Sequence, residues 1–281
     1  MNIVHADQME WGGRLTAHRG GHMTHKVLFE GEEGSPDNYL LVLANESSDY
    51  YSPRHRHPWD QVRYCLEGAI PVGEGSTIQA GEIGYFPEGV RYGPQRGGPD
   101  RIVLLLQVGG ASGQGYLSPA QLEAGRAGLA AEGHFEAGVF KRSSASGEKH
   151  EDAYEAIWRG VTGRPLEYPE PRYAAPVILR PEAFAWAEVP DMFGTRSRWL
   201  GQYPDRDLSL EMIATASGCA CTSEAAPLRR LLFVIRGEGQ CNGAAYRARS
   251  AVRLEPGEAA TFMASKATEL LAIGVPTLGA A

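Results

Sequence analysis

Residues 51–92 read YSPRHRHPWDQVRYCLEGAIPVGEGSTIQAGEIGYFPEGVRY, and this stretch decides which fold the sequence predicts. His55 and His57 are one residue apart, so on an extended strand both imidazoles point to the same face. Gln61 begins an alternating run in which Arg63 shares its face. A Glu-Gly turn ends this run, and the later block GEIGYFPEG adds another strand and turn. The stretch therefore predicts short strands that carry two histidines and further polar side chains on one inward face.

The composition of the chain is that of an ordinary globular protein. Its 281 residues suffice for one or two domains with buried cores. The formal net charge of −7 argues against general nucleic-acid binding, which relies on basic surface to neutralise phosphates. No apolar run approaches the ~20 residues of a membrane span, and the N-terminal residues lack the basic and apolar parts of a secretory signal. We therefore expect a cytoplasmic protein with neither a nucleic-acid nor a membrane partner.

The strand signals predict an all-β protein. Residues 38–45, 83–86 and 102–108 read as buried strands, and 35 glycines and 18 prolines are scattered through the chain. Short strands at regular spacing with such turns indicate an antiparallel barrel or sandwich. In a small barrel the inward face can hold one small ligand. We expect the first barrel to occupy residues 1–112.

A helical segment is predicted after this barrel. Ser118 is expected to cap a helix with Pro119 at its first position, and this helix should end near Gly133. A second helix is predicted over residues 151–161, and a proline-rich passage follows it. Residues 113–172 are therefore expected to connect two domains.

From Tyr173 onward the chain repeats the pattern of its first part. The run RLLFVIRG parallels QVRYCLEG, and the turn at Gly257 parallels the turn at Gly81. Counting from these turns, the positions of the two histidines, the glutamine and the last ligand are taken by Glu224, Ala226, Arg230 and Thr268. These side chains do not make a coherent site for a divalent metal. We expect residues 173–281 to form a second, degenerate barrel.

The stretch 51–92 resembles the two sequence motifs of the cupin superfamily. His55 and His57 fall on the family's paired histidines, Gln61 on its glutamate, and Tyr92 on its third histidine. The resemblance implies an all-β fold of two cupin barrels (jelly-roll or double-stranded β-helix) in tandem, with a small helical connecting segment. It also implies a bicupin with one candidate site, since the second half has lost the ligand residues.

The same resemblance implies one divalent transition metal (Fe, Mn, Ni, Cu or Zn) bound by His55, His57, Gln61 and Tyr92. Neutral imidazoles suit all of these metals. The amide oxygen of Gln61 is neutral, so a bound dication keeps its full charge and attracts an anionic or oxygen-rich substrate. Arg63 is expected to pair with a substrate carboxylate or enolate. Tyr92 either coordinates as a phenolate, or leaves a position open and acts as an acid/base or hydrogen-bond donor.

The sequence is compatible with three functions. The first is a metal-dependent enzyme that carries out dioxygenase-type oxidation of a small, oxygen-rich or anionic substrate, because bicupins with one decayed half recur in that class. The HxHxxxQ set is also similar to the manganese hydroxynitrile lyases of cupin form, which makes a lyase or isomerase the alternative. The loss of two of the usual ligands supports a third function, a non-catalytic bicupin that binds a small molecule. A homodimer is compatible with each and is expected.

Four of the eight histidines lie near the N-terminus, at His5, His18, His22 and His25. Two glycines between His18 and His22 disfavour a helix, so we do not expect chelation across one helical turn. The segment is expected to be a surface or subunit-contact strand. One of its histidines reaching the metal pocket is the alternative.

Overall fold

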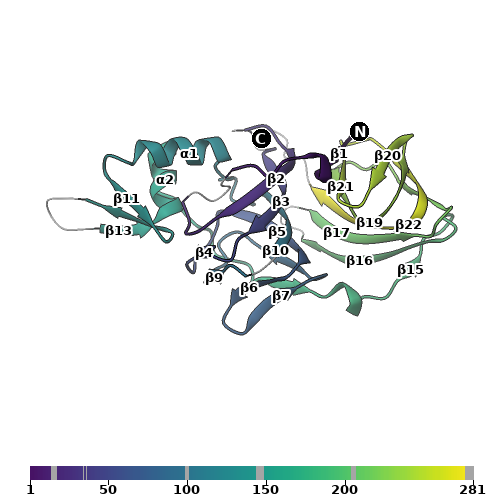
Figure 1. The fold of residues 1–281 in the computed structure, drawn as a ribbon, viewed down its shortest axis with the longest axis horizontal. Helices are drawn as coiled ribbons and strands as arrows, with labels where there is room; N and C mark the ends of the chain where they lie inside the picture. Colours follow the sequence, from purple (N-terminus) through teal and green to yellow (C-terminus); the bar gives the residue numbers. More distant parts are fainter. Residues whose placement is uncertain are drawn as a thin grey trace. The chain divides into compact units, whose positions relative to one another are not determined.

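The computed structural model consists mainly of antiparallel strands, with two α-helices among the residues it describes (Figure 1). The described residues are 1–13, 18–33, 35, 37–98, 101–143, 149–203 and 207–275. The chain divides into two compact units, which we call the N-terminal unit (residues 11–179) and the C-terminal unit (residues 1–10 and 180–281). Residues 113–172, expected to be a connector, thus belong to the N-terminal unit.

The N-terminal unit is built on a six-stranded antiparallel sheet in the order β14-β8-β5-β10-β3-β2. These strands are β2 (Met23–Glu30), β3 (Tyr39–Glu46), β5 (Trp59–Glu67), β8 (Ile83–Phe86), β10 (Arg101–Gly109) and β14 (Val177–Leu179). Two further ladders pair β4 (Tyr51–Ser52) with β9 (Gln95–Arg96), and β6 (Ala69–Gly73) with β7 (Ser76–Gln79). The strands predicted at 38–45, 83–86 and 102–108 are confirmed. The strand expected to carry the two histidines is instead a loop with one isolated bridge.

The helical segment forms a small subdomain within this unit. Its elements are α1 (Pro119–Gly128), α2 (Ala153–Thr162) and the sheet of β11 (Gly133–Glu136), β12 (Val139–Arg142) and β13 (Lys149–Asp152). Ser118 caps α1 as predicted, because its hydroxyl accepts from the backbone N–H of Gln121 and the Gln121 side chain accepts in return. The helix ends at Gly128 rather than near Gly133, which instead begins β11. The two helices pack closely enough that a Cβ on Gly125 would lie 2.7 Å from side-chain atoms of α2.

The core of the N-terminal unit joins this subdomain to the barrel strands. Buried side chains of β3 and β10, including Leu40, Val42 and Leu105, form one cluster with Tyr154 and Trp158 of α2. A shared core of this kind makes the segment part of the barrel domain, since removing it would expose apolar surface on both partners.

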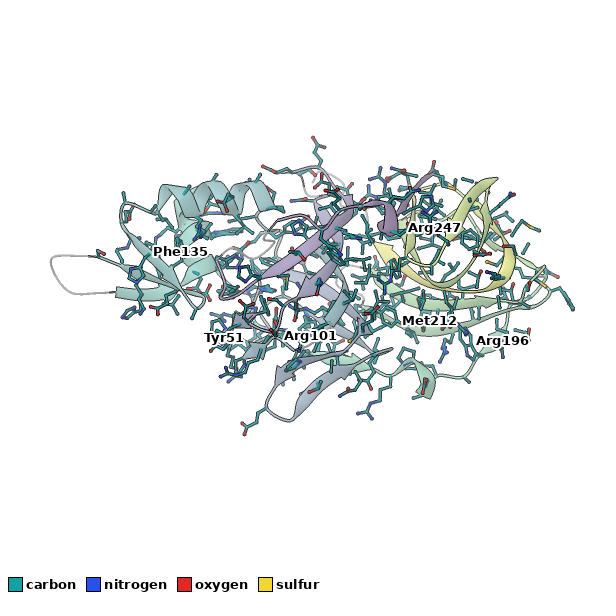
Figure 2. The ribbon with its side chains drawn as sticks, in the orientation of Figure 1. Tyr51, Arg101, Phe135, Arg196, Met212 and Arg247 are labelled. Atoms are coloured by element: carbon teal, nitrogen blue, oxygen red, sulfur yellow. The ribbon has the colours of Figure 1, made fainter. Side chains whose placement is uncertain are left out.

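The C-terminal unit contains one nine-stranded sheet and two short 3-10 helices. Its strands are β1 (Asn2–His5), β15 (Ala187–Glu188), β16 (Thr195–Tyr203), β17 (Leu208–Thr215), β18 (Ala220–Ser223), β19 (Arg229–Cys241), β20 (Ala244–Arg247), β21 (Ser250–Leu254) and β22 (Ala260–Val275), and its 3-10 helices are η1 (Ala6–Gln8) and η2 (Pro181–Ala183). The strand β1 pairs with β21, which is why residues 1–10 belong here rather than to the first barrel. Arg247 of β20, which Figure 2 labels, pairs with Asp7 of η1 and holds the same segment in place.

The interior of the C-terminal unit is filled by apolar side chains. Its core cluster includes Leu232, Val234, Phe262 and Leu270. The side chains at the positions that correspond to the first-barrel ligands have different environments and different partners. Glu224 is exposed, Arg230 donates to two backbone carbonyls, and Thr268 bonds to Tyr246 at 3.0 Å.

No helix in the described part of the chain is long and apolar enough to cross a membrane. All four cysteines are free.

Candidate active site

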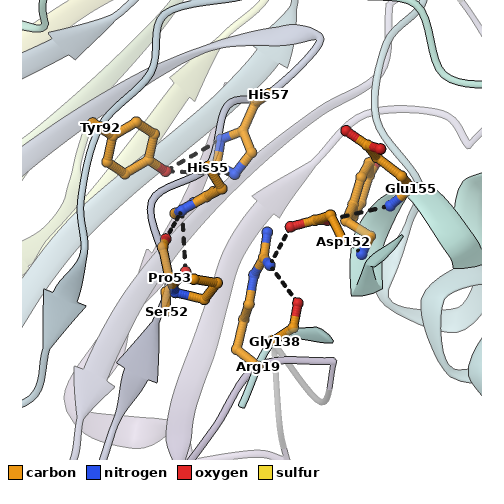
Figure 3. Close-up of polar contacts among 10 residues, drawn as sticks. Arg19, Ser52, Pro53, His55, His57, Tyr92, Gly138, Asp152 and Glu155 are labelled. Atoms are coloured by element: carbon orange, nitrogen blue, oxygen red, sulfur yellow. Dashed lines mark hydrogen bonds and ion pairs between the residues drawn. The ribbon is translucent and has the colours of Figure 1, made fainter. Parts of the chain in front are cut away.

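Backbone hydrogen bonds bring the two motifs of residues 51–92 together. His55 and Tyr92 exchange a pair of N–H···O bonds, each 3.0 Å long, and the N–H of Gly89 donates to the carbonyl of His57 at 2.7 Å. The ring centroid of His55 consequently lies 4.8 Å from that of His57 and 4.4 Å from that of Tyr92 (Figure 3). Three of the predicted site residues are therefore neighbours, although they come from different loops.

His55 is held in one tautomer by its surroundings. Its Nδ1 lies 2.7 Å from the carbonyl oxygen of Pro53 and 3.1 Å from the hydroxyl of Ser52 (Figure 3). A carbonyl can only accept, so Nδ1 carries the proton and Nε2 keeps its lone pair. Burial, with the charge of Arg19 as the next cause, holds the pKa of His55 well below its usual range. The imidazole is thus neutral and able to donate a lone pair.

His57 lies with its ring stacked on Trp59, at a centroid distance of 4.1 Å and an interplanar angle of 10°. Its two ring nitrogens are 3.3 and 3.4 Å from the phenol oxygen of Tyr92 (Figure 3). Desolvation, followed by the nearby His55, lowers the pKa of His57 well below its usual range. Two neutral imidazoles are therefore packed side by side, as a metal-binding pair requires.

Arg63 of β5 reaches the same place from the strand. Its Nε donates to the amide oxygen of Gln61 at 2.7 Å, and its Nη2 donates to the phenol oxygen of Tyr92, also at 2.7 Å. The guanidinium packs over the ring of Phe86, with 4.8 Å from Cζ to the centroid. The side chain is buried, its Nη1 has no hydrogen-bond partner, and no carboxylate among the described residues pairs with it. An arginine buried in this way presents an uncompensated positive charge.

Tyr92 is a neutral phenol in this arrangement. Burial raises its pKa, and the charge of Arg63 offsets that effect only in part. The phenol oxygen accepts from Arg63 and keeps its own proton. Tyr92 contacts His57 and Arg63 but is not among the residues that line the cavity described next.

A cavity of about 50 Å³ lies in front of these residues. Its polar lining includes His18, Arg19, Glu46, His55, His57, Gln61, Arg63 and Gln107. Of the charged groups, Glu46 is paired with Arg101 at 2.6 Å and Arg19 with Asp152. Leu117, Leu122 and Tyr154 of the helical subdomain line it as well, so the segment expected to connect two barrels instead forms part of the wall. A volume of this size admits a few non-hydrogen atoms or a small number of waters.

His18 is a cavity residue that the sequence analysis placed at the surface. It is buried, its Nδ1 has no hydrogen-bond partner, and its pKa is held well below the usual range by burial and then by Arg19. The neighbouring Arg19 pairs with Asp152 at 2.9 Å and donates to the carbonyl of Gly138, which fixes the segment against the subdomain (Figure 3). His18 therefore agrees with the alternative that one N-terminal histidine reaches the pocket, and not with the surface strand expected first, while His22 is exposed as expected.

Asp60, the carboxylate next to Gln61 in the sequence, lies on the other face of β5. Its carboxylate accepts from the hydroxyl of Tyr85 at 3.0 Å and from the backbone N–H of Glu88 at 2.8 Å. This position agrees with strand alternation, which puts residues 60 and 61 on opposite faces.

The two histidine nitrogens suit a transition metal, whereas the oxygens of Gln61 and Tyr92 already accept hydrogen bonds. His55 has the arrangement common in metal-binding histidines, with one ring nitrogen bonded to a carbonyl and the other free. Gln61 and Tyr92 already give their oxygens to the guanidinium of Arg63. Within the described residues, no three His, Cys, Asp or Glu side chains lie close enough to hold a metal. The two imidazoles fit a divalent metal as they stand, and the two oxygens fit it once Arg63 releases them.

No protein-family model matches the sequence, and no curated protein matches it. Solved structures do match the fold. A protein from Nostoc punctiforme, provisionally assigned as a dioxygenase, aligns with a TM-score of 0.65 at 11% identity, over 100% of this chain and 84% of its own. Oxalate decarboxylase from Bacillus subtilis, in a study of its Mn(II) centres, aligns with a TM-score of 0.57 at 14% identity, over 99% of this chain and 78% of its own.

At such identities the likeness concerns the fold, and it extends over the whole of this chain. The chain therefore shares the fold of these structures, and its predominance of strands confirms the all-β class that residues 51–92 and the internal repeat predicted.

Proposed function

We propose that the chain is a metal-dependent cupin enzyme that acts on a small organic anion, and that its active site lies in the N-terminal unit. The observation that carries this proposal is Arg63, a buried guanidinium on the cavity wall whose Nη1 is unpaired and which has no carboxylate partner among the described residues. Burying a cation without a counter-charge is costly, and an anionic ligand removes that cost. The bound anion would lie against Arg63, within the cavity that the two histidines also line.

The size of the cavity limits the substrate to few non-hydrogen atoms. About 50 Å³ suits a carboxylate or enolate of a small acid better than an aromatic ring system. Gln107 and His18 lie on the same wall and can bond to the polar groups of such a molecule. The apolar side chains of Leu117 and Leu122 exclude water from the other side.

His55 and His57, with Gln61 and Tyr92, are the residues that would hold the metal. The chemistry of these donors suits Fe, Mn, Ni, Cu or Zn. A metal bound there supplies Lewis acidity and, for iron, manganese or copper, redox chemistry. The chain's own groups prepare this position. Pro53 and Ser52 fix the His55 tautomer, Trp59 supports the ring of His57, and Tyr92 orients Arg63.

Dioxygenase-type oxidation is the reaction class that we propose first. Two imidazoles without a carboxylate leave metal positions open, and the similar Nostoc punctiforme structure has been given a dioxygenase assignment. A lyase or isomerase is the second candidate, supported by the HxHxxxQ set and by the likeness to an oxalate decarboxylase. A cytoplasmic location and a homodimer belong to the same proposal.

The test is turnover of small carboxylates and enolates by metal-loaded protein, with oxygen uptake and substrate loss measured in parallel. Oxygen-dependent loss identifies a dioxygenase, and loss without oxygen identifies a lyase or isomerase. Arg63→Lys, which keeps the charge but loses the planar fork, should raise KM at least about tenfold. Arg91→Lys, a change of the same kind at an exposed position near the motif, should behave like the native chain.

An unchanged KM in Arg63→Lys would contradict the assignment of Arg63 to the substrate. Affinity for a carboxylate without turnover under any metal would instead identify a non-catalytic, small-molecule-binding bicupin.

A further inference from the structure

We infer that Arg63 couples metal binding to anion binding: while no anion is bound, its guanidinium withholds the oxygen donors from the metal, and a bound carboxylate releases them. The inference rests on the proposed function, because it assigns a regulatory role to the residue that the proposal gives to the substrate. Its evidence is the bonding of Gln61 and Tyr92 to Arg63.

Both oxygen donors of the motif are bonded to the same cation. The amide oxygen of Gln61 accepts from Nε and the phenol oxygen of Tyr92 accepts from Nη2, each at 2.7 Å. Gln61 and Arg63 follow one another on the inward face of β5, and Tyr92 is fixed beside His55 by two backbone bonds. The guanidinium therefore lies among the side chains that a metal would use.

The positive charge of Arg63 opposes a dication in the same pocket. Like charges in a poorly solvated site repel strongly, and the carboxylate that lines the same cavity, Glu46, is paired with Arg101 and not with Arg63. The imidazoles of His55 and His57 are neutral or positive and so do not compensate it either. A metal that binds in this state meets two available imidazoles and the repelling charge of Arg63, while Arg19 on the same cavity wall is paired with Asp152.

A carboxylate changes both conditions at once. It neutralises Arg63, and hydrogen bonds between a guanidinium and a carboxylate are roughly twice as strong as bonds to neutral oxygens. The unpaired Nη1 is the first contact available to it. As the guanidinium turns toward the carboxylate, Gln61 and Tyr92 lose their present partner and become available to a metal. The two ligands then favour each other's binding.

The test is calorimetric titration of Co²⁺ into the metal-depleted full-length chain, with saturating acetate or with chloride at equal ionic strength. Acetate is chosen because it fits the cavity and binds Co²⁺ weakly in solution, and a blank titration without protein corrects for that binding. We expect acetate to tighten Co²⁺ binding about tenfold, inside the range of roughly 5–150-fold common for coupled sites. Co²⁺ must then tighten acetate binding by the same factor, because such coupling is reciprocal.

Substitution of Arg63 separates the coupling from the metal site itself. Arg63→Met removes the cation that competes for the oxygens, so Co²⁺ should bind about tenfold more tightly without acetate, and acetate should add nothing further. Arg91→Met removes the same charge from an exposed position beside Tyr92 and should leave the coupling intact. The visible absorption of bound Co²⁺ reports the number of ligands and should change when acetate is added only in the chains that retain Arg63.

Equal Co²⁺ affinity with acetate and with chloride in the native chain would overturn the inference, and this comparison needs no variant to fold. It would leave the proposed function standing if Co²⁺ still binds and is lost in His57→Ala. Failure of the native chain to bind Co²⁺ under either condition would overturn the metal-dependent function as well.

Discussion

His55 illustrates how a single side chain is prepared for ligand binding. The carbonyl of Pro53 fixes its tautomer, and the backbone pairing with Tyr92 fixes its position. The spacing of His55, His57 and Gln61 placed these three in one site from the sequence alone, since the motif is local. His18 could not be found in this way, because it reaches the cavity through a long-range contact between Arg19 and Asp152.

Acidification should destabilise the N-terminal unit of the metal-free protein. The pKa values of His18, His55 and His57 lie well below 6.5 in the folded chain because the rings are buried. The unfolded chain therefore binds more protons below about pH 6.5, and the stability present above that pH is lost as the pH falls toward the folded pKa values. Each histidine contributes up to about 1.4 kcal/mol per pH unit in that window.

Urea unfolding at about pH 7.5 and about pH 5.5 measures this loss. His55→Asn should show a shallower dependence on pH than the native chain. A midpoint that does not change with pH would contradict the assignment of neutral, buried histidines.

Tyr92→Phe should destabilise the N-terminal unit even though the ring is kept. The change removes the oxygen that accepts from Arg63 Nη2, so a second nitrogen of a buried guanidinium loses its partner. We expect a loss of about 1–3 kcal/mol in the free energy of unfolding. Tyr246→Phe is the matched control, because its hydroxyl bonds to the neutral Thr268 and should be worth only about 1 kcal/mol. Equal losses in the two variants would show that the charge of Arg63 does not depend on Tyr92.

At the scale of the elements, the sequence predicted the two helices of the helical subdomain but not the surface on which they pack. Ser118 was predicted to begin a helix, and it does, because a cap is set by neighbouring residues. The second predicted helix forms as α2 and ends at the left-handed Gly163. The packing partner of the segment was not encoded locally. Its apolar faces cover the cavity of the N-terminal unit, where Tyr154 and Leu122 line the wall.

Asp152 should matter twice, as the N-cap of α2 and as the partner of Arg19. Its carboxylate accepts from the backbone N–H groups of Tyr154 and Glu155 and from the Arg19 guanidinium. Asp152→Asn keeps a capping oxygen but leaves the buried Arg19 guanidinium without its counter-charge, which should cost about 1–3 kcal/mol. Asp152→Ala should cost about 1 kcal/mol more through loss of the cap.

Urea unfolding of the three chains measures both steps. Asp7→Asn, at a surface pair with Arg247 in the C-terminal unit, should give no measurable loss. If Asp152→Asn were as stable as the native chain, the subdomain would not depend on Arg19 for its attachment.

At the scale of the whole molecule, the internal repeat predicted two barrels, of which the second has lost the ligand residues. The assignment of residues 1–10 to the C-terminal unit was not predicted. It depends on the pairing of β1 with β21, which are far apart in the sequence, and no local pattern indicates that pairing. The expectation of a degenerate second barrel agrees with the interior of the C-terminal unit, where apolar side chains such as Phe262 and Leu270 pack together. The polar cavity that we propose as the metal site lies in the N-terminal unit.

The most direct test of this account is elemental analysis by ICP-MS of untagged protein, beside His55→Ala, His57→Ala and the exposed control His22→Ala. The account predicts about one transition-metal ion per chain in the native protein and in His22→Ala, and its loss in the two site variants with circular dichroism largely unchanged. Iron or copper would favour oxidation, and manganese or zinc a lyase or isomerase. Metal content that is unchanged in both site variants, or absent from every chain, would contradict the account.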